Sequence, residues 1–392
     1  ALCATRLKSQ FGRKQPAGTG FVCRLAVRRY HRLRQRSTVP AGDLHQRLSA
    51  LAIPESLGTA LLSFSLNTAV DPPMSLTRHL NDKQSPFRKL LEDCAPALTT
   101  AAGRSKAGKE FARQLGFYDL VNSPLVVPLP EEVHDKRRHS PTVGTAFDIR
   151  TRMMLGEFDP RRTASALGVR AFDFMCSQFI TDGESMVELL ADSFREAELL
   201  TIQGNEEDRD RASIVFAWCE AFYRADVSVL FGSLRKRLQV SGTVDDLFDS
   251  IPSTMLTDVF NLRAANQAQI EQWRKKIREG TKYVGNPCFA GSYLVDGADG
   301  DWFVDVTLFD CKVVDKISAS WVQKVLMQLL GYLILDLDND YQAECIGIWL
   351  PRQATVKTWA IEEILGRDAS TILAEARMNV ESVMERGVRV VA

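Results

Sequence analysis

The sequence predicts an α/β fold in which helices flank a mixed central sheet and a large helical insertion interrupts the core. The sheet is indicated by two short apolar runs, 302–304 and 307–311, with a two-residue turn between them. Two further apolar runs, 343–350 and 353–360, follow a helical stretch. The insertion is indicated by 159–282, where apolar residues recur every three or four positions. A chain of 392 residues is long enough to bury a core of this size.

The chain is expected to divide into three parts. Residues 1–73 form a basic leader that is disordered or not native, 74–141 form an N-terminal helical segment, and 142–392 form the domain that contains the sheet and the insertion. Proline and charged residues over 128–141 predict a surface loop at the end of the second part. The other expected elements are helices at 142–158, 320–335 and 369–386, with breaks in the insertion near 204–205 and 241–243.

The leader is distinguished by its charge. Residues 1–73 carry 11 Lys and Arg against 3 Asp and Glu, so the zero net charge of the chain conceals +8 there and −8 in the remainder. Three interpretations compete: a nucleic-acid-binding arm, an organellar transit peptide, and sequence that does not belong to the native protein. We favour the third, because the chain begins with Ala1 and a normal helix start follows its first methionine, Met74.

Charged residues gather at the open end of the predicted hairpin. With the turn at 305–306, Asp301 is opposite Asp310 and Asp299 is opposite Lys312, so all four side chains project from one face. Three carboxylates and an ammonium group on one patch perturb each other unless a divalent cation joins them. Carboxylate oxygens suit Mg²⁺ or Mn²⁺, and a lysine can stabilise a phosphate. The hairpin therefore predicts a metal-dependent site for phosphodiester cleavage.

This pattern resembles the PD-(D/E)XK nuclease superfamily, and in particular its RecB-like branch. Asp301 (or Asp299) matches the first metal-binding acid of that family, and Asp310-Cys311-Lys312 matches its (D/E)-X-K element. Gln328 and Tyr332 match the Gln-x-x-x-Tyr element on the helix that follows. The resemblance implies a restriction-endonuclease-like core, Mg²⁺ or Mn²⁺ as cofactor, catalytic roles for these residues and nucleic acid, most simply DNA, as the substrate.

A further part of the resemblance lies upstream, on the helix expected at 142–158. Gly144 to Asp148 is similar to the Gly-x-x-x-His motif of RecB-like nucleases, with Asp148 in the place of the histidine. A carboxylate there could still reach the metal ion. Arg150 and Arg152 follow, either on a solvated helix face or in contact with a phosphate. The expected metal ligands are thus Asp148, Asp299, Asp301 and Asp310.

Other interpretations stay open beside this one. Asp299-Gly300-Asp301 is also typical of a solvated turn, and Asp310 with Lys312 of an exposed strand face. The apolar flanks favour a buried strand, in which carboxylates need a partner. Two other functions remain: a non-catalytic nucleic-acid-binding or assembly module on the same fold, and a phosphoesterase acting on small nucleotides. A long positive groove beside the acids would favour the nuclease, and a small concave pocket the phosphoesterase.

The composition of the chain limits the class of protein to which it can belong. Hydrophobic residues make up 45% and charged residues 25% of the chain, as in ordinary globular proteins, and no apolar run approaches the roughly 18 residues of a membrane span. We expect a cytoplasmic protein with no membrane partner, and leave a protein partner or homo-oligomer open. Eight cysteines are scattered without a Cys-x-x-Cys pair, which predicts reduced thiols and no zinc site. Only Cys345 follows the Gln-x-x-x-Tyr element, so the resemblance implies no iron–sulfur cluster.

Overall fold

The computed structural model describes residues 75–389, apart from 157, 181–182, 225–228 and 230–231. All described residues belong to one compact unit. The expected leader over 1–73 lies outside the described residues.

Five strands form one mixed sheet in the order β1-β2-β3-β4-β5. β3 and β4 are parallel, and the other neighbours are antiparallel. The parallel pair is possible because helix α17 (Ala319–Leu335) connects the two strands. The expectation of an α/β fold with a mixed sheet is thereby confirmed. The strands are Tyr283–Gly285, Trp302–Val304, Thr307–Cys311, Cys345–Leu350 and Thr355–Ala360.

The β2–β3 hairpin has the register that its turn predicts. Trp302 pairs with Phe309 and Val304 pairs with Thr307, which leaves a turn of two residues. Asp305 opens that turn with a φ of 63°, a conformation that Asp tolerates better than most residues. Strand β1 was not predicted, because three residues are too few to show an alternating pattern.

One face of the sheet packs against α17. Phe303, Leu308 and Ile348 are buried in the same core cluster as the apolar side of that helix. Side chains alternate along a strand, so Asp310, two residues after Leu308, is directed to this face. The opposite face is covered as well, because Trp273 of helix α16 packs against an aromatic group on the strands. Its ring centroid lies 5.7, 5.1 and 5.1 Å from those of Trp302, Phe309 and Trp349.

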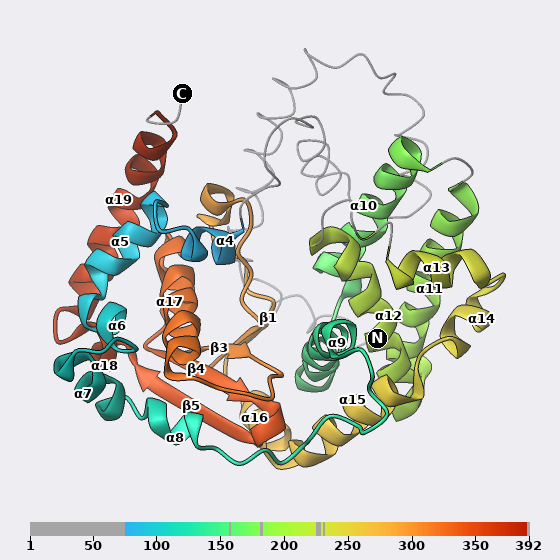
Figure 1. Cartoon of the computed structure of the whole chain (residues 1–392), viewed down its shortest axis with the longest axis horizontal. Helices are drawn as coiled ribbons and strands as arrows, with labels where there is room; N and C mark the ends of the chain where they lie inside the picture. The colour runs from blue at the N-terminus through green and yellow to red at the C-terminus, as the bar shows by residue number, and fades with distance from the viewer. Residues whose placement is uncertain (1–74, 157, 181–182, 225–228, 230–231, 390–392) are drawn as a thin grey trace, which may run out of the picture. The chain divides into compact units, whose positions relative to one another are not determined.

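The N-terminal helices and the last helix cover the outer side of α17. In Figure 1, α5 and α19 lie side by side beyond it. A Cβ atom on Gly331 of α17 would lie 3.2 Å from Leu76 and 3.3 Å from Phe87, so this helix and its neighbours are in close contact. The helices of this layer are α4 (Leu76–Asn81), α5 (Pro86–Cys94), α6 (Pro96–Thr100), α7 (Lys106–Gln114), α8 (Phe117–Val121), α18 (Ile361–Leu365) and α19 (Ala369–Arg389).

Helix α9 (Lys136–Leu155) begins earlier than predicted and ends earlier too. The expected loop over 128–141 is therefore wrong in its second half. The side chain of Asp135 accepts a hydrogen bond from the backbone NH of Arg138 and caps the helix six residues before Pro141. Pro141 is exposed, so water can satisfy the carbonyl group that lacks its helical partner.

The elements described between α9 and β1 are all helices, as expected for the insertion. The predicted breaks are confirmed, since α11 ends at Gln203 and α13 ends at Val240. Within the described ranges, none of the helices has the length and the apolar composition that crossing a lipid bilayer requires. The helices of the insertion are η1 (Pro160–Arg162), α10 (Ala164–Phe179), α11 (Glu184–Gln203), α12 (Glu206–Arg224), α13 (Ser233–Val240), α14 (Val244–Asp249), α15 (Ser253–Ala265) and α16 (Gln267–Arg278).

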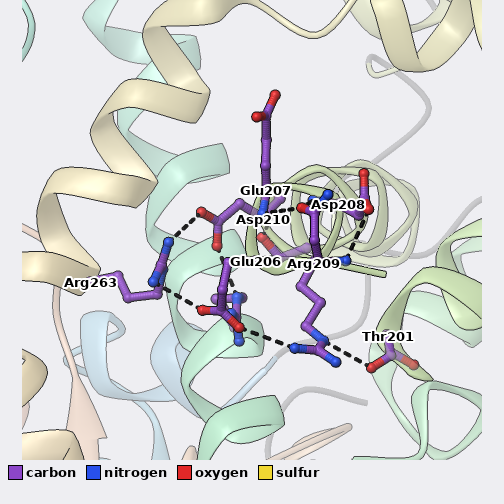
Figure 2. A network of polar contacts seen from close by, with 10 residues as sticks. Thr201, Glu206, Glu207, Asp208, Arg209, Asp210 and Arg263 are labelled. Carbon is purple, nitrogen blue, oxygen red and sulfur yellow. Dashed lines mark hydrogen bonds and ion pairs between the residues drawn. The ribbon is translucent and has the colours of Figure 1, made fainter. Parts of the chain in front are cut away.

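A polar network fixes the start of α12 against α9 and α15. Asp210 accepts hydrogen bonds from Arg150 of α9 at 2.8 Å and from Arg263 of α15 at 3.2 Å. Glu206 binds the same two arginines at 2.7 and 3.0 Å. Figure 2 shows Arg263 facing both acids, with Arg209 on the other side of Glu206. These ion pairs anchor the first turn of α12 and thereby fix the position of the whole helix, including its last turn.

The close contact between α10 and α12 gives a test of the fold. A Cβ atom on Gly168 would lie 1.7 Å from the carbonyl oxygen of Cys219, so Gly168→Ala is expected to lower the free energy of unfolding by roughly 1–3 kcal/mol. Gly144→Ala on α9 is the matched control, because the nearest atom there, Cβ of Val313, is at an ordinary 3.7 Å. Thermal unfolding should separate the two variants, and equal melting temperatures would contradict this packing.

Candidate active site

The Asp-x-Lys element lies at the end of β3, in the middle of the sheet. The side chain of Asp310 is 2% exposed. Lys312 donates a hydrogen bond from Nζ to Oδ1 of Asp310 at 2.8 Å and lies 2.8 Å from Oδ2 as well. Its own side chain is 29% exposed. A lysine that reaches solvent is thus held by a buried acid.

Asp301 lies across the hairpin from this pair. Its Oδ2 accepts a 2.5 Å hydrogen bond from the backbone NH of Cys311. That bond ties the residue before β2 to the end of β3. The structure therefore brings Asp301, Asp310 and Lys312 together on the face of the sheet that α17 covers.

Asp148 approaches the same place from α9. Its carboxylate is close enough to Asp301 for the two negative charges to repel each other. Its Oδ2 accepts a hydrogen bond from Arg152, one helical turn further on, whereas its Oδ1 is buried and accepts none. Arg152 also donates to Oδ1 of Asn286 at 3.2 Å. The expected solvated face for Arg150 and Arg152 is wrong, because both arginines are buried and each guanidinium group is paired with carboxylates of the protein itself.

Gln328 and Tyr332 face the acids from α17. The side-chain amide of Gln328 donates a 2.6 Å hydrogen bond to the phenol oxygen of Tyr332. The ring of Tyr332 stacks on Phe289 with centroids 5.2 Å apart. Burial, and then the negative charge of Asp310, raise the pKa of Tyr332, so its hydroxyl stays protonated. Since the oxygen accepts from Gln328, the hydroxyl hydrogen remains available for donation.

Two residues of the helical insertion enter this cluster and were not predicted. Glu220 and Arg224 lie one turn apart near the end of α12, and Nε of Arg224 donates to Oε1 of Glu220 at 2.5 Å. A terminal nitrogen of Arg224 lies 4.0 Å from Oδ2 of Asp299. The sequence carries a signal for Glu220, which is buried and directly follows the apolar run 214–219. A carboxylate in such a run needs a partner.

The carboxyl groups of the cluster perturb one another. Burial raises the pKa of Asp148 to about 8, with Asp301 and Glu220 adding to the effect and Arg152 offsetting only part of it. Burial likewise raises the pKa of Asp310 to about 6, against the effect of Lys312 and with that of Asp301. The pKa of Asp299 is raised by burial and then by Glu220 and Asp301, although Arg224 opposes this. Burial is thus the main cause of these raised pKa values, and repulsion among the carboxyl groups adds to it.

The carboxylate groups of the cluster are ligands that divalent cations bind, although their side chains are not arranged around one point. In the part of the chain that the structure describes, no three His, Cys, Asp or Glu side chains are grouped closely enough to hold a metal ion. Asp148 and Asp310 are instead turned to Arg152 and Lys312. However, Oδ1 of Asp148 is buried and accepts no hydrogen bond, and the ammonium group of Lys312 at 2.8 Å is the contact given for Oδ2 of Asp310. Unsatisfied carboxylate oxygens are the donors that Mg²⁺ and Mn²⁺ prefer, so the donor set fits.

A separate cavity of about 380 Å³ lies away from the acids. It is lined at the tip of the hairpin and on the opposite face of the sheet, by residues such as Trp273, Asp305 and Thr358. None of its lining residues belongs to the acid cluster, so this cavity does not favour a small nucleotide as the ligand of that cluster.

No family model, curated protein or solved structure matches the chain. The case for a function therefore rests on the side chains of the cluster and on their contacts. Five carboxyl groups and three cations meet there, from α9, α12, the hairpin and its flanks. Gln328 and Tyr332 of α17 complete the cluster. Every residue proposed from the sequence lies in this cluster: Asp148, Asp299, Asp301, Asp310, Lys312, Gln328 and Tyr332.

Proposed function

We propose that the chain is a divalent-cation-dependent nuclease that hydrolyses phosphodiester bonds in DNA. The observation that carries this proposal is the meeting of Asp310 and Lys312 with Asp301 and Asp148, where Oδ1 of Asp148 is buried without a hydrogen bond. Such a cluster is costly unless a cation joins it. An oxygen-only donor set beside a lysine is suited to a metal ion and a phosphate.

The order of elements around the cluster supports the same proposal. α9, the β2–β3 hairpin, α17, β4 and β5 follow one another along the chain, and α10 to α16 are inserted after α9. This is the order expected of a restriction-endonuclease-like core, which the Asp-x-Lys and Gln-x-x-x-Tyr elements also imply. We therefore propose that core for residues 142–392.

The acids have the first role in this proposal. Asp301 and Asp310 would hold Mg²⁺ or Mn²⁺, with Asp148 and Asp299 as further ligands. When bound, the cation would polarise the phosphate and lower the pKa of the attacking water. Arg152 is positioned to neutralise Asp148 and Glu220 when the cation is absent, because it lies within electrostatic reach of both.

Lys312 acts as a positive charge rather than as a base. Burial alone would lower the pKa of its amine, but Asp310 and Asp301 outweigh burial and raise that pKa above the usual value. The ammonium group is therefore protonated, and Lys312 is the more exposed residue of the Asp310–Lys312 pair. It can stabilise negative charge that develops on a phosphate. The protonated hydroxyl of Tyr332 can donate a hydrogen bond at the same site.

The proposal predicts metal-dependent cleavage that requires Asp310. Linear and circular DNA should be cut in the presence of Mg²⁺ or Mn²⁺, and Asp310→Asn should reduce cutting to background. Calorimetric titration with Mn²⁺ should show affinity at least about tenfold weaker in Asp310→Asn, since even residues behind metal ligands contribute this much. The matched control is Asp305→Asn at the other end of the same hairpin, where Asn tolerates the positive φ of the exposed turn.

The results of these cleavage and binding assays distinguish a nuclease from a binding module and from a phosphoesterase. Cleavage by wild type and Asp305→Asn, but not by Asp310→Asn, supports the nuclease. Equal cleavage by all three proteins would place the activity elsewhere. Mn²⁺ binding with no cleavage of any nucleic acid would contradict the nuclease and favour a binding module, whereas hydrolysis of nucleotides alone would favour a phosphoesterase.

A further inference from the structure

Arg224 is a cation that the helical insertion contributes to the acid cluster. Its side chain is 58% exposed, against 29% for Lys312 and 6% for Arg152. Among the cations of the cluster, Arg224 is thus the one most open to solvent. It stands at the edge of the cluster, while the acids lie deeper.

The guanidinium group of Arg224 is oriented but only partly used. Glu220 accepts a hydrogen bond from its Nε at 2.5 Å and holds the plane of the group. Asp299, at 4.0 Å from a terminal nitrogen, is within ion-pair range but beyond hydrogen-bond range. Among the described residues, the terminal amino groups have no hydrogen-bond acceptor. A guanidinium group that is held at Nε and free at its terminal nitrogens is prepared to bind a phosphate through two parallel hydrogen bonds.

A second exposed cation stands on the same side of the cluster. Arg162, the last residue of η1, is exposed and lies within electrostatic reach of Cys288, which forms a β-bridge with Asp299. Its neighbour Arg161 is paired with Glu198 at 2.7 Å, whereas Arg162 makes no ion pair within the described ranges. The insertion therefore supplies two positive groups near the bridge between Cys288 and Asp299, Arg224 at Asp299 and Arg162 at Cys288.

We propose that Arg224, assisted by Arg162, binds a backbone phosphate next to the one that is cleaved. This proposal rests on the nuclease function proposed above and makes it more specific: the substrate is a polynucleotide, held by the helical insertion, and not a single nucleotide. A mononucleotide has no neighbouring phosphodiester, so it would leave both arginines unused. In a polynucleotide, the acids and their cation act on one phosphate while the arginines hold the next.

Glu220 is the positioning residue in this arrangement. Without it, the exposed side chain of Arg224 would sample many rotamers, since a free arginine loses considerable conformational entropy when it is ordered. Glu220 is buried between α12 and the acids, and the network around Asp210 anchors the other end of α12. The insertion thereby presents Arg224 to the site from a fixed helix.

Binding to a fluorescein-labelled DNA duplex, measured by anisotropy over a series of salt concentrations without divalent cation, tests the proposal. Arg224→Gln is expected to weaken binding about tenfold, as expected for a lost charged hydrogen bond. The slope of log K against log salt should fall by about one, because one phosphate contact is removed. Arg162→Gln should change both quantities in the same direction. The control is Arg195→Gln on α11, an arginine of similar exposure (54%) that is paired within its own helix.

Steady-state cleavage adds a second readout. Arg224→Gln should raise KM for the duplex with a smaller effect on kcat, and should lower kcat/KM for the duplex by a larger factor than kcat/KM for bis(p-nitrophenyl) phosphate, because that diester has no neighbouring phosphate. If wild type binds and cuts DNA but Arg224→Gln and Arg162→Gln both behave like Arg195→Gln, this inference is overturned and the nuclease stands. If wild type neither binds nor cuts any nucleic acid, the nuclease proposal itself is overturned.

Discussion

Lys312→Ala is expected to lower kcat for DNA cleavage by about 10²–10³-fold, the usual effect of removing one group that stabilises developing negative charge. The reason is the geometry of the Asp310–Lys312 pair. Both carboxylate oxygens of Asp310 lie 2.8 Å from Nζ, so the ammonium group is held in place at the mouth of the buried acids. No other lysine occupies this position among the residues assigned to the cluster.

The matched control is Lys316→Ala. Lys316 is exposed, lies four residues further along the chain and carries the same charge. Steady-state kinetics on one DNA substrate, with circular dichroism to establish folding, should show a large loss of kcat in Lys312→Ala and a change within a few-fold in Lys316→Ala. A Lys312→Ala protein that is folded and as active as Lys316→Ala would show that this lysine has no part in the chemistry.

The hairpin half of the site could be predicted because local rules determine it. A two-residue turn sets the register of the flanking strands, and the register sets which side chains share a face. The turn at 305–306 between the two apolar runs gives the pairing of Trp302 with Phe309, and hence the approach of Asp301 to Asp310. Gln328 and Tyr332 were predicted from the resemblance to the Gln-x-x-x-Tyr element, and helical spacing adds that they share one face of the helix.

The part of the site that the helical insertion contributes could not be predicted, because it depends on packing between helices that are far apart in the sequence. Glu220 and Arg224 reach the acids only because Asp210, at the other end of α12, is bound by arginines of α9 and α15. No local pattern encodes that docking. The polarity of Glu220 in an apolar run indicates that some partner is needed, but it does not identify Asp299 or Asp148 as neighbours.

Arg150 and Arg152 show a second limit of sequence patterns. Arginine on a helix is most often exposed, so a solvated face was the natural prediction. In the structure both side chains are buried, and their partners are acids brought from distant segments or from one turn away. Burial of a charge is decided by the tertiary partner, which a single sequence does not reveal.

A buried ion network elsewhere in the domain predicts the largest effect on stability. Asp258 of α15 is fully buried and accepts hydrogen bonds from Arg352 at 3.0 and 2.7 Å and shares one with Nε2 of His139 at 2.8 Å. Asp258→Ala would leave the guanidinium group of Arg352 buried and poorly paired, so the free energy of unfolding should fall by about 3–5 kcal/mol. Denaturant unfolding measures this loss in the free energy of unfolding. The control is Glu198→Ala, which breaks the more exposed ion pair with Arg161 and should cost about 1 kcal/mol or less.

The pH dependence identifies the charge of Asp258 as the cause. Burial alone would raise the pKa of this carboxyl, but the hydrogen bonds from His139 and Arg352 outweigh burial and lower it below the usual value. A carboxyl whose pKa is lower in the folded state stabilises the fold fully above its unfolded pKa of about 3.9, and this contribution is lost as the pH falls through the folded pKa. The stability difference between wild type and Asp258→Ala should therefore shrink below about pH 4.

A double variant separates the ion network from packing. Asp258→Leu with Arg352→Met should be more stable than Asp258→Ala, because it removes both charges and leaves neither unpaired. If instead the double variant is the less stable of the two, the loss in Asp258→Ala comes from packing and not from the ion network.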